Sequence, residues 1–232
     1  MQPAEMKATL ETDGFLILRQ FLTPEQLEAL RDACHPVQEQ YGVRQVLQHC
    51  PDIVKALPTS HIANILNNVG LSGATTVRSI FFNKNASHNW LVPWHQDKTI
   101  CVDTAAGIAG YEKWTKKNGV VHAEPPASIL ENMLTWRFAL DDTPPQNGAL
   151  KLIPGSHRQG KLTSDELNIM TAAQPAYCCE LKAGDVLLMR PLIVHASEKS
   201  QECSQRRVLH LEMSNAELSA PLQWAERLSP AH

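Results

Sequence analysis

The stretch from Asn89 to Lys98 carries residue types suited to metal chemistry, because His95 and Asp97 form a His-x-Asp pair inside an apolar, aromatic-rich segment. On an extended strand, residues i and i+2 point to the same face, so this spacing aims an imidazole and a carboxylate at one point. With a second imidazole from elsewhere, these donors would make a two-histidine, one-carboxylate set that binds Fe(II) and leaves positions open for a cosubstrate and O2. The pair also occurs by chance in many chains, so the interpretation needs a distant third ligand.

The other histidines differ in how well they suit that third position. Several lie in segments that predict helices, polar loops, solvent-facing turns or the chain end: His35, His49, His61, His88, His122, His157 and His232. His195 and His210 lie within apolar strand-like runs, and Ala196-Ser197 after His195 puts its ring at a strand end. A histidine in an apolar strand is more often a hydrogen-bonded core residue, so the residues alone leave both candidates open.

Composition predicts one globular domain and excludes some partners. A chain of 232 residues with 43% hydrophobic residues can bury one sizeable core. The formal net charge of -3, with scattered lysines and arginines, argues against a nucleic-acid partner. No apolar run approaches the roughly 20 residues of a membrane span, and no signal peptide is recognisable at the start. We therefore expect a cytoplasmic protein with no membrane partner and with reduced thiols at its six cysteines.

Helices are expected mainly in the first 72 residues. After an apolar strand at 14–18, Thr23, Pro24 and Gln26 predict a capped helix start. A second helical region is expected over 43–57, interrupted at Pro51, and a third over 60–70. These helices would cover one face of a sheet.

From Ala74 the hydrophobic period changes to two, which predicts strands. The predicted strands follow from residue 74 and over 133–140, 149–153, 186–189, 193–195 and 206–213. Residues 98–127 contain several Gly and Pro residues and break this regularity, so we expect a lid or binding loop there. Many short strands preceded by helices favour a sandwich or barrel with a helical cover over alternating β/α units.

The order of several short motifs resembles the phytanoyl-CoA dioxygenase family of Fe(II)- and 2-oxoglutarate-dependent oxygenases. The matching segments are Gly14–Leu18, Pro93–Asp97, Leu140–Asp142, Asn147–Leu150, Ile153–His157, Gly184-Asp185, His195–Ser197 and Arg206. The resemblance implies a double-stranded β-helix, or jelly roll, with N-terminal helices packed on one sheet. It implies one oxygenase domain over 1–232, with a mostly helical cover at 1–72, a core at 73–214 and a C-terminal tail at 215–232.

The resemblance also assigns roles to particular residues. His95, Asp97 and His195 match the iron ligands, Arg206 matches the arginine that pairs with the distal carboxylate of 2-oxoglutarate, and Ser197 matches a hydroxyl that assists it. Strand alternation favours Arg206 over Arg207, which shares its face with Leu209 and Leu211. A guanidinium suits a carboxylate in bidentate fashion.

Further residues on the expected interior faces are weaker candidates. Thr135 and Arg78 are expected to contact the cosubstrate, and Arg137, Lys98 and Trp94 the substrate. Buried arginines need an anion, so Arg78 and Arg137 would bind a carboxylate of the cosubstrate or substrate. The open alternatives are that either arginine pairs with a structural Asp or Glu, and that the tryptophans are core residues.

The implied reaction is hydroxylation of an unactivated C–H bond of a small-molecule metabolite, with succinate and CO2 as coproducts of 2-oxoglutarate and O2. Halogenating relatives replace the ligating carboxylate by a small residue, whereas Asp97 is present here. Desaturation and ring formation remain open, as do a cupin-like metal enzyme that does not use 2-oxoglutarate and a non-catalytic binding protein. The sequence predicts neither the substrate nor the oligomeric state.

Overall fold

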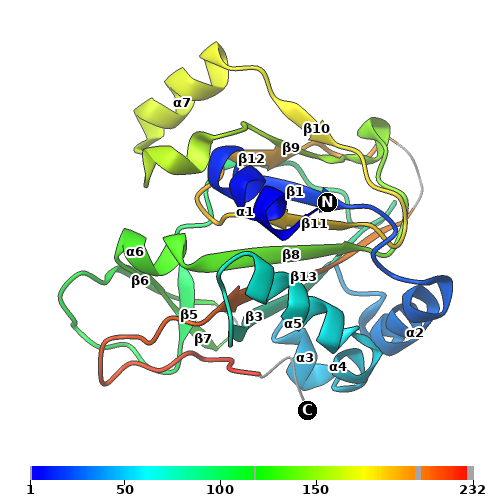
Figure 1. The fold of residues 1–232 in the computed structure, drawn as a ribbon, viewed down its shortest axis with the longest axis horizontal. Coiled ribbons are helices and arrows are strands. Elements are labelled where there is room, and N and C mark those ends of the chain that lie inside the picture. Colours follow the sequence, from blue (N-terminus) through cyan, green and yellow to red (C-terminus); the bar gives the residue numbers. More distant parts are fainter. Residues whose placement is uncertain (1, 118, 202–204, 229–232) are drawn as a thin grey trace.

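A six-stranded antiparallel sheet lies at the centre of the computed structural model, which describes residues 2–117, 119–201 and 205–228. Its strand order is β1-β11-β8-β13-β3-β2. The strands are β1 (Phe15–Leu18), β2 (Gly42–Arg44), β3 (Thr75–Lys84), β8 (Met133–Ala139), β11 (Val186–Met189) and β13 (Arg206–Ser214). Strands from both ends of the chain thus lie side by side (Figure 1).

Two smaller sheets complete the β-structure of the described residues. A four-stranded sheet has the order β10-β9-β12-β4, and a three-stranded sheet the order β5-β7-β6. The strands are β4 (Val92–His95), β5 (Ile100–Val102), β6 (Glu112–Lys117), β7 (Val120–Glu124), β9 (Leu150–Leu152), β10 (Tyr177–Cys179) and β12 (His195–Ser197). Side chains from the six- and four-stranded sheets line one cavity, so these two sheets face each other as in a jelly roll. The expected fold class is confirmed, although the sheets do not close into a barrel.

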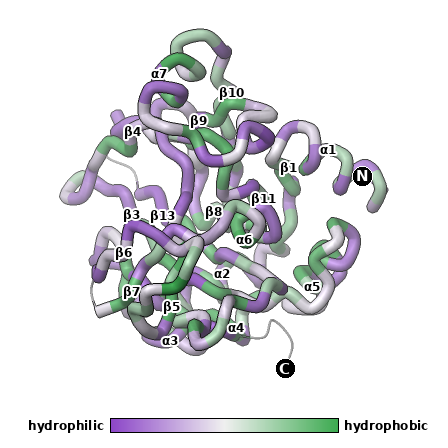
Figure 2. The backbone as a smooth tube through the Cα atoms, turned by 90° about the vertical axis from the view of Figure 1, so that its left-hand side faces the viewer, coloured by the Kyte–Doolittle hydropathy of each residue, from purple (hydrophilic) through white to green (hydrophobic). Residues whose placement is uncertain are grey.

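The first five helices of the chain cover the outer face of the six-stranded sheet. The helices are α1 (Pro3–Thr12), α2 (Pro24–Cys34), α3 (Val46–His49), α4 (Asp52–Ala56), α5 (Thr59–Asn68), α6 (Ala127–Glu131) and α7 (Ser164–Ala173), with short 3-10 turns η1 (His35–Val37), η2 (Pro145–Asn147) and η3 (Ser156–Gln159). As predicted, Thr23 caps α2, its side chain accepting from the Gln26 amide. Figures 1 and 2 place α7 and the group α2 to α5 at opposite ends of the molecule. None of the described helices is long and apolar enough to cross a bilayer.

The period-two pattern of β8 and β13 separates the hydrophobic core from the cavity. Trp136 and Phe138 of β8 and Leu209 and Leu211 of β13 are fully buried against the helical cover. Burying each such side chain stabilises the fold by about 1.5–3 kcal/mol. The alternate residues of both strands face the interior, so packing of the outer face determines which side chains reach the cavity.

Two predicted elements were wrong in part, and some elements were not predicted. Residues 43 and 44 of the expected second helical region belong to strand β2, which forms because it pairs with β3. A strand of three residues has no local sequence pattern that reveals it. The expected irregular loop at 98–127 contains the three-stranded sheet, whose strand β6 is polar and mostly exposed and so lacks a hydrophobic period. Helices α1 and α7 and strand β10 were not predicted.

The described cysteines are all free thiols, as expected for a chain with reduced cysteines. Four of the five are buried. The predictions for Cys203 and His232 fall outside the described residues.

Candidate active site

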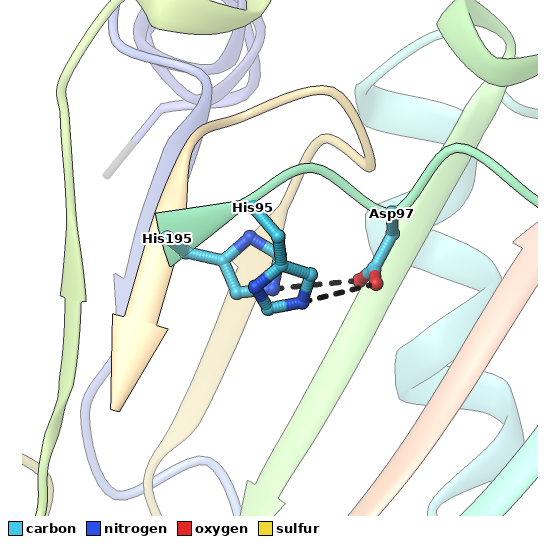
Figure 3. Close-up of side chains that lie close together, drawn as sticks. All are labelled: His95, Asp97 and His195. Carbon is cyan, nitrogen blue, oxygen red and sulfur yellow. Dashed lines mark ion pairs between the residues drawn. The ribbon is translucent and has the colours of Figure 1, made fainter. Parts of the chain in front are cut away.

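The side chains of His95, Asp97 and His195 meet at one point beside the four-stranded sheet, which is called the small sheet below (Figure 3). Antiparallel pairing of β4 and β12 makes His95 and His195 direct partners, with ring centroids 4.2 Å apart. The Nε2 atoms of His95 and His195 each lie 3.6 Å from an oxygen of Asp97. Asp97 lies two residues beyond the end of β4, so the expected strand geometry holds only for the histidine.

Backbone contacts set the orientation of both imidazoles. Nδ1 of His95 lies 2.9 Å from the carbonyl oxygen of Pro93, and Nδ1 of His195 lies 2.9 Å from that of Ile193. Each Nδ1 must carry a proton to donate to a carbonyl, which leaves the Nε2 lone pair directed toward Asp97. Such contacts to the second nitrogen are typical of metal-ligating histidines.

The geometry of these three side chains fits a divalent metal ion. All ligand atoms lie within 4.8 Å of one another. Ligands about 2.1 Å from a common ion are roughly 3.0–3.4 Å apart, so small rotations of the side chains would close the site. Two nitrogens and one carboxylate oxygen on one face are the donor set expected for non-haem Fe(II).

The protonation states of the three residues also suit metal binding. Burial opposes ionisation of Asp97, but the imidazoles of His195 and His95 hold its pKa well below the usual range. Burial lowers the pKa of His195 to about 4, so this imidazole is neutral at pH 7. For His95, burial is outweighed by contacts to Asp97, which raise the pKa, so protons compete with a metal at its Nε2.

Gln96 anchors the turn that carries Asp97. Its Nε2 donates to the carbonyl oxygens of Gly160 and Leu192 at 2.8 and 2.7 Å, and its Oε1 accepts from the Leu162 amide. The side chain is 6% exposed and does not line the cavity. It therefore positions the ligands on either side of it.

A cavity of about 220 Å³ extends from the candidate metal ligands between the two sheets. Six cationic side chains line it, against two carboxylates. The cations are Arg44, Arg78, Lys84, Lys117, Arg137 and Arg206, and the carboxylates are Asp97 and Glu212. A cavity with this imbalance favours anionic ligands.

Arg206 is one of these cations that have no carboxylate partner in the described chain. Its Nη1 donates to the carbonyl oxygen of Gly148 and lies 3.5 Å from Ser197 Oγ, while its buried Nε has no partner there. Burial and the charge of Arg137 lower its pKa to about 9, and at pH 7 the guanidinium remains a cation. A buried guanidinium with free N–H capacity fits a carboxylate ligand.

The neighbouring residue Arg207 points away from the cavity. Its guanidinium donates to both carboxylate oxygens of Asp141, at 2.9 and 2.7 Å. Strand alternation thus places the two arginines as the sequence predicted.

Lys84 lies beside Arg206 at the same end of the cavity. The fully buried ammonium donates to Ser197 Oγ and to the Glu198 carbonyl oxygen, both at 2.8 Å. Burial, together with the charges of Arg206 and Arg137, lowers the pKa of Lys84 to about 7. An anion bound here would restore the charged form.

Arg78 and Arg137 reach the cavity in different ways. Arg78 Nη1 pairs with Glu212 at 2.8 Å, which is the structural alternative that the sequence left open. Arg137 Nη1 lies 3.0 Å from Nδ1 of His210, whose Nε2 lies 3.3 Å from Glu212. Both nitrogens of His210 are therefore engaged, although His210, Glu212 and Asp97 also lie close enough to form a metal site.

Three weaker candidates lie outside the cavity lining. Thr135 faces the interior and is fully buried, but it does not border the cavity. Trp94 packs against the apolar cluster of Ile153 and Val194, and Lys98 donates to the Leu162 carbonyl oxygen at 2.7 Å. The structure thus gives Trp94 a packing contact and Lys98 a hydrogen bond, and their contact with a substrate stays a prediction.

Sequence reasoning did not identify Arg44 and His122 as residues that border the cavity. His122, expected to face solvent, is 2% exposed. The run from Val120 to Glu124 has no hydrophobic period of two, and strand β7 buries His122 because it pairs with β5 and β6.

Comparisons with known proteins identify the family of the chain. The family model for phytanoyl-CoA dioxygenase (PhyH) matches residues 10–208. The dioxygenase cdmA of Talaromyces verruculosus is 23% identical over 258 residues, covering 98% of this chain and 80% of that protein.

Solved structures share the fold. SnoK, a non-haem α-ketoglutarate-dependent carbocyclase from nogalamycin biosynthesis, superposes with a TM-score of 0.69 at 20% identity, covering 92% of this chain and 84% of SnoK. EctD from S. alaskensis, solved with 2-oxoglutarate and 5-hydroxyectoine, has a TM-score of 0.71 at 17% identity, covering 91% of this chain and 75% of EctD. The chain belongs to the phytanoyl-CoA dioxygenase (PhyH) family of oxidoreductases.

Proposed function

We propose that this protein is an Fe(II)- and 2-oxoglutarate-dependent dioxygenase that hydroxylates an unactivated C–H bond of a small molecule, releasing succinate and CO2. The observation that carries the proposal is the convergence of His95, Asp97 and His195 at one end of a cavity that has the buried Arg206 at the other. Family membership and the related structures support the same reaction class.

In this proposal the residues of the chain divide the work of binding. His95, Asp97 and His195 would hold Fe(II), and Arg206, with Ser197 and Lys84 beside it, would hold the distal carboxylate of 2-oxoglutarate. When bound, the iron and cosubstrate supply the oxidation of a C–H bond by O2. The protein orients both reactants, and Ile80, Phe82 and Val92 give the cavity walls that exclude water.

Arg137 has a positioning role in this arrangement. Its guanidinium lies over the Phe82 ring at 5.8 Å and contacts His210, and no described carboxylate pairs with it. It can therefore donate to a carboxylate of cosubstrate or substrate near the metal ligands.

Anaerobic titration with Fe(II) and 2-oxoglutarate tests the cofactor assignment. We expect the weak visible charge-transfer band of the chelate in the wild-type protein and its loss in His195→Ala. The absence of any band in the wild-type protein would overturn the proposal. The variant Arg207→Ala, whose guanidinium lies outside the cavity, serves as the control.

The reaction type needs a separate experiment, because related enzymes include a carbocyclase and an epimerase. A metabolite panel is screened for succinate release under ¹⁸O2, and the product of each hit is weighed. Hydroxylation predicts a product that gains one labelled oxygen atom. A product that loses two hydrogens or keeps its mass would contradict hydroxylation while leaving the cofactor assignment intact.

A further inference from the structure

The cavity holds more positive charge than the proposed cofactors neutralise. Arg78 is balanced by Glu212, and Arg206 faces the expected distal carboxylate of 2-oxoglutarate. Fe(II) is balanced by Asp97 and the second carboxylate of the cosubstrate. Arg44, Lys117 and Arg137 then remain, together with Lys84 whenever it is charged. Because a cavity lined mainly by charges of one sign attracts ligands of the opposite sign, a further anion is the natural ligand.

Two of these surplus cations line the cavity from different sheets, and the charges of both act on His122. Arg44 ends strand β2 and is the partner of Ile80 on β3, so its side chain shares the cavity face of the large sheet. Lys117 ends β6 of the three-stranded sheet. Neither side chain forms an ion pair or a hydrogen bond within the described part of the chain.

His122 supplies a third polar group between them. It is 2% exposed and lines the cavity from β7, flanked by Cys101 of β5 and Thr115 of β6. Its Nδ1 lies 3.1 Å from the Val120 carbonyl oxygen, while its buried Nε2 has no partner among the described residues. A buried ring nitrogen that lines a cavity without a partner is a ligand-facing group, because such atoms are otherwise satisfied.

The protonation of His122 is consistent with its surroundings. Burial and the charge of Arg78 lower its pKa to about 4, with smaller contributions from Arg44 and Lys117. Because Nδ1 donates to the Val120 carbonyl, the neutral ring has a lone pair at Nε2. An anion bound beside it would therefore be accompanied by uptake of a proton at Nε2, which turns this nitrogen into a donor and raises the pKa of the ring.

We infer that Arg44, Lys117 and His122 form a substrate-recognition subsite for an anionic group, so that the substrate class is a small molecule carrying a carboxylate or a phosphate. The inference rests on the proposed function, since it names the substrate of the same cavity. The apolar walls at Ile80 and Phe82 would contact the uncharged part of that molecule.

Nitrogen-15 NMR of histidine-labelled protein tests this subsite without turnover. The full chain is loaded with Zn(II) and saturating 2-oxoglutarate, which occupies the end of the cavity at Arg206. Benzoate and phenyl phosphate are then titrated as probes, with benzamide as the uncharged match for benzoate. The imidazole signals of His122 are assigned from the variant His122→Gln.

We expect saturable shifts of the His122 signals with benzoate, phenyl phosphate or both, and none with benzamide. The stronger of the two anions identifies the group as a carboxylate or a phosphate. Arg44→Gln should weaken binding about tenfold or more, since a charged hydrogen bond is lost. Lys117→Gln, a surface change that keeps the fold, should weaken binding in the same direction, whereas the matched change Lys116→Gln, on an exposed neighbour outside the cavity, should not.

The absence of shifts with both anions would overturn the inference, and so would equal shifts with benzamide or unchanged binding in both cavity variants. These outcomes are distinct from failure of the proposed function. That failure appears as a missing charge-transfer band in the Fe(II) titration, where no benzoate or phosphate is present.

Discussion

At the scale of single residues, the two adjacent arginines of β13 allow a test of which of them binds 2-oxoglutarate. Arg206→Ala removes a buried cation that has no carboxylate partner in the described chain, whereas Arg207→Ala breaks a bidentate pair with Asp141 on the other face. We expect Arg206→Ala to raise the KM for 2-oxoglutarate on the order of 100-fold, the loss of a bidentate charged contact.

The matched variant Arg207→Ala should lower the melting temperature and leave that KM nearly unchanged. Steady-state succinate release measures the first quantity and thermal unfolding the second. Equal effects of the two variants on KM would contradict the assignment of Arg206.

Lys84 gives a prediction about pH. Burial, with the charges of Arg206 and Arg137, lowers its folded pKa to about 7, below the usual value of 10.5. Between these two values the unfolded chain binds more protons than the folded one, so stability rises with pH across that window. Relative to Lys84→Met, the wild-type free energy of unfolding should increase by up to about 1.4 kcal/mol per pH unit.

Urea unfolding of the ligand-free protein at several pH values between 7 and 10 measures this difference. The exposed variant Lys116→Met provides the control, for which we expect a curve parallel to that of the wild type. If the difference in the free energy of unfolding between the wild type and Lys84→Met stays constant with pH, Lys84 keeps its ordinary proton affinity.

At the scale of elements, the turn after β4 determines where Asp97 lies. The side chain of Gln96 makes three hydrogen bonds to backbone groups of residues 160, 162 and 192. This side chain does not line the cavity and makes no hydrogen bond to the side chains of the candidate metal ligands. Gln96→Leu should therefore lower the affinity for Mn(II) about 10-fold to 100-fold, the usual effect of removing a group that orients a metal ligand.

Asn83→Leu is the appropriate control, because it also removes a buried side-chain amide. Asn83 lies on β3, is fully buried and does not line the cavity. Mn(II) binding followed by electron paramagnetic resonance compares the two variants. The role given to Gln96 requires the control to lose stability while retaining Mn(II) affinity.

Elements with a strong internal pattern could be predicted from sequence. Strands β8 and β13 alternate large apolar residues such as Trp136 and Leu209 with interior residues, so both their existence and their facing follow from the period of two. Strand β2 has three residues and exists because it pairs with β3, so the sequence gives no local pattern for it. Arg44 and His122 were missed for this reason, since their place in the cavity depends on tertiary pairing.

The candidate metal ligands were predictable for a different reason. His95 and Asp97 are close in sequence, and the third ligand came from the resemblance of the whole chain to a family. The residues alone left His210 open as the third ligand. Its contacts to Arg137 and Glu212, which decide against it, join residues far apart in sequence and emerge only in the folded chain.

At the scale of the whole molecule, the proposed ligands would link the two facing sheets. His95 and His195 belong to the small sheet, whereas Arg206 and Lys84 belong to the large one. The division into one oxygenase domain with a helical cover at 1–72 stays a prediction. In this arrangement His95 and His195 would hold the metal from the four-stranded sheet, and Arg206 and Lys84 would hold a carboxylate of 2-oxoglutarate from the six-stranded sheet.

This geometry predicts that Mn(II) and 2-oxoglutarate stabilise the fold cooperatively. A ligand at 100 times its Kd adds about 2.7 kcal/mol to the free energy of unfolding. We expect 2-oxoglutarate to bind at least about tenfold more tightly with Mn(II) present, because the chelate and the Arg206 contact then form together. Succinate keeps both carboxylates but lacks the 2-oxo group, so its stabilisation should depend little on Mn(II). Urea unfolding with each ligand alone and with both measures the coupling, and His195→Ala should abolish it. Purely additive stabilisation by Mn(II) and 2-oxoglutarate would mean that the two bind at separate places, which contradicts a single site spanning both sheets.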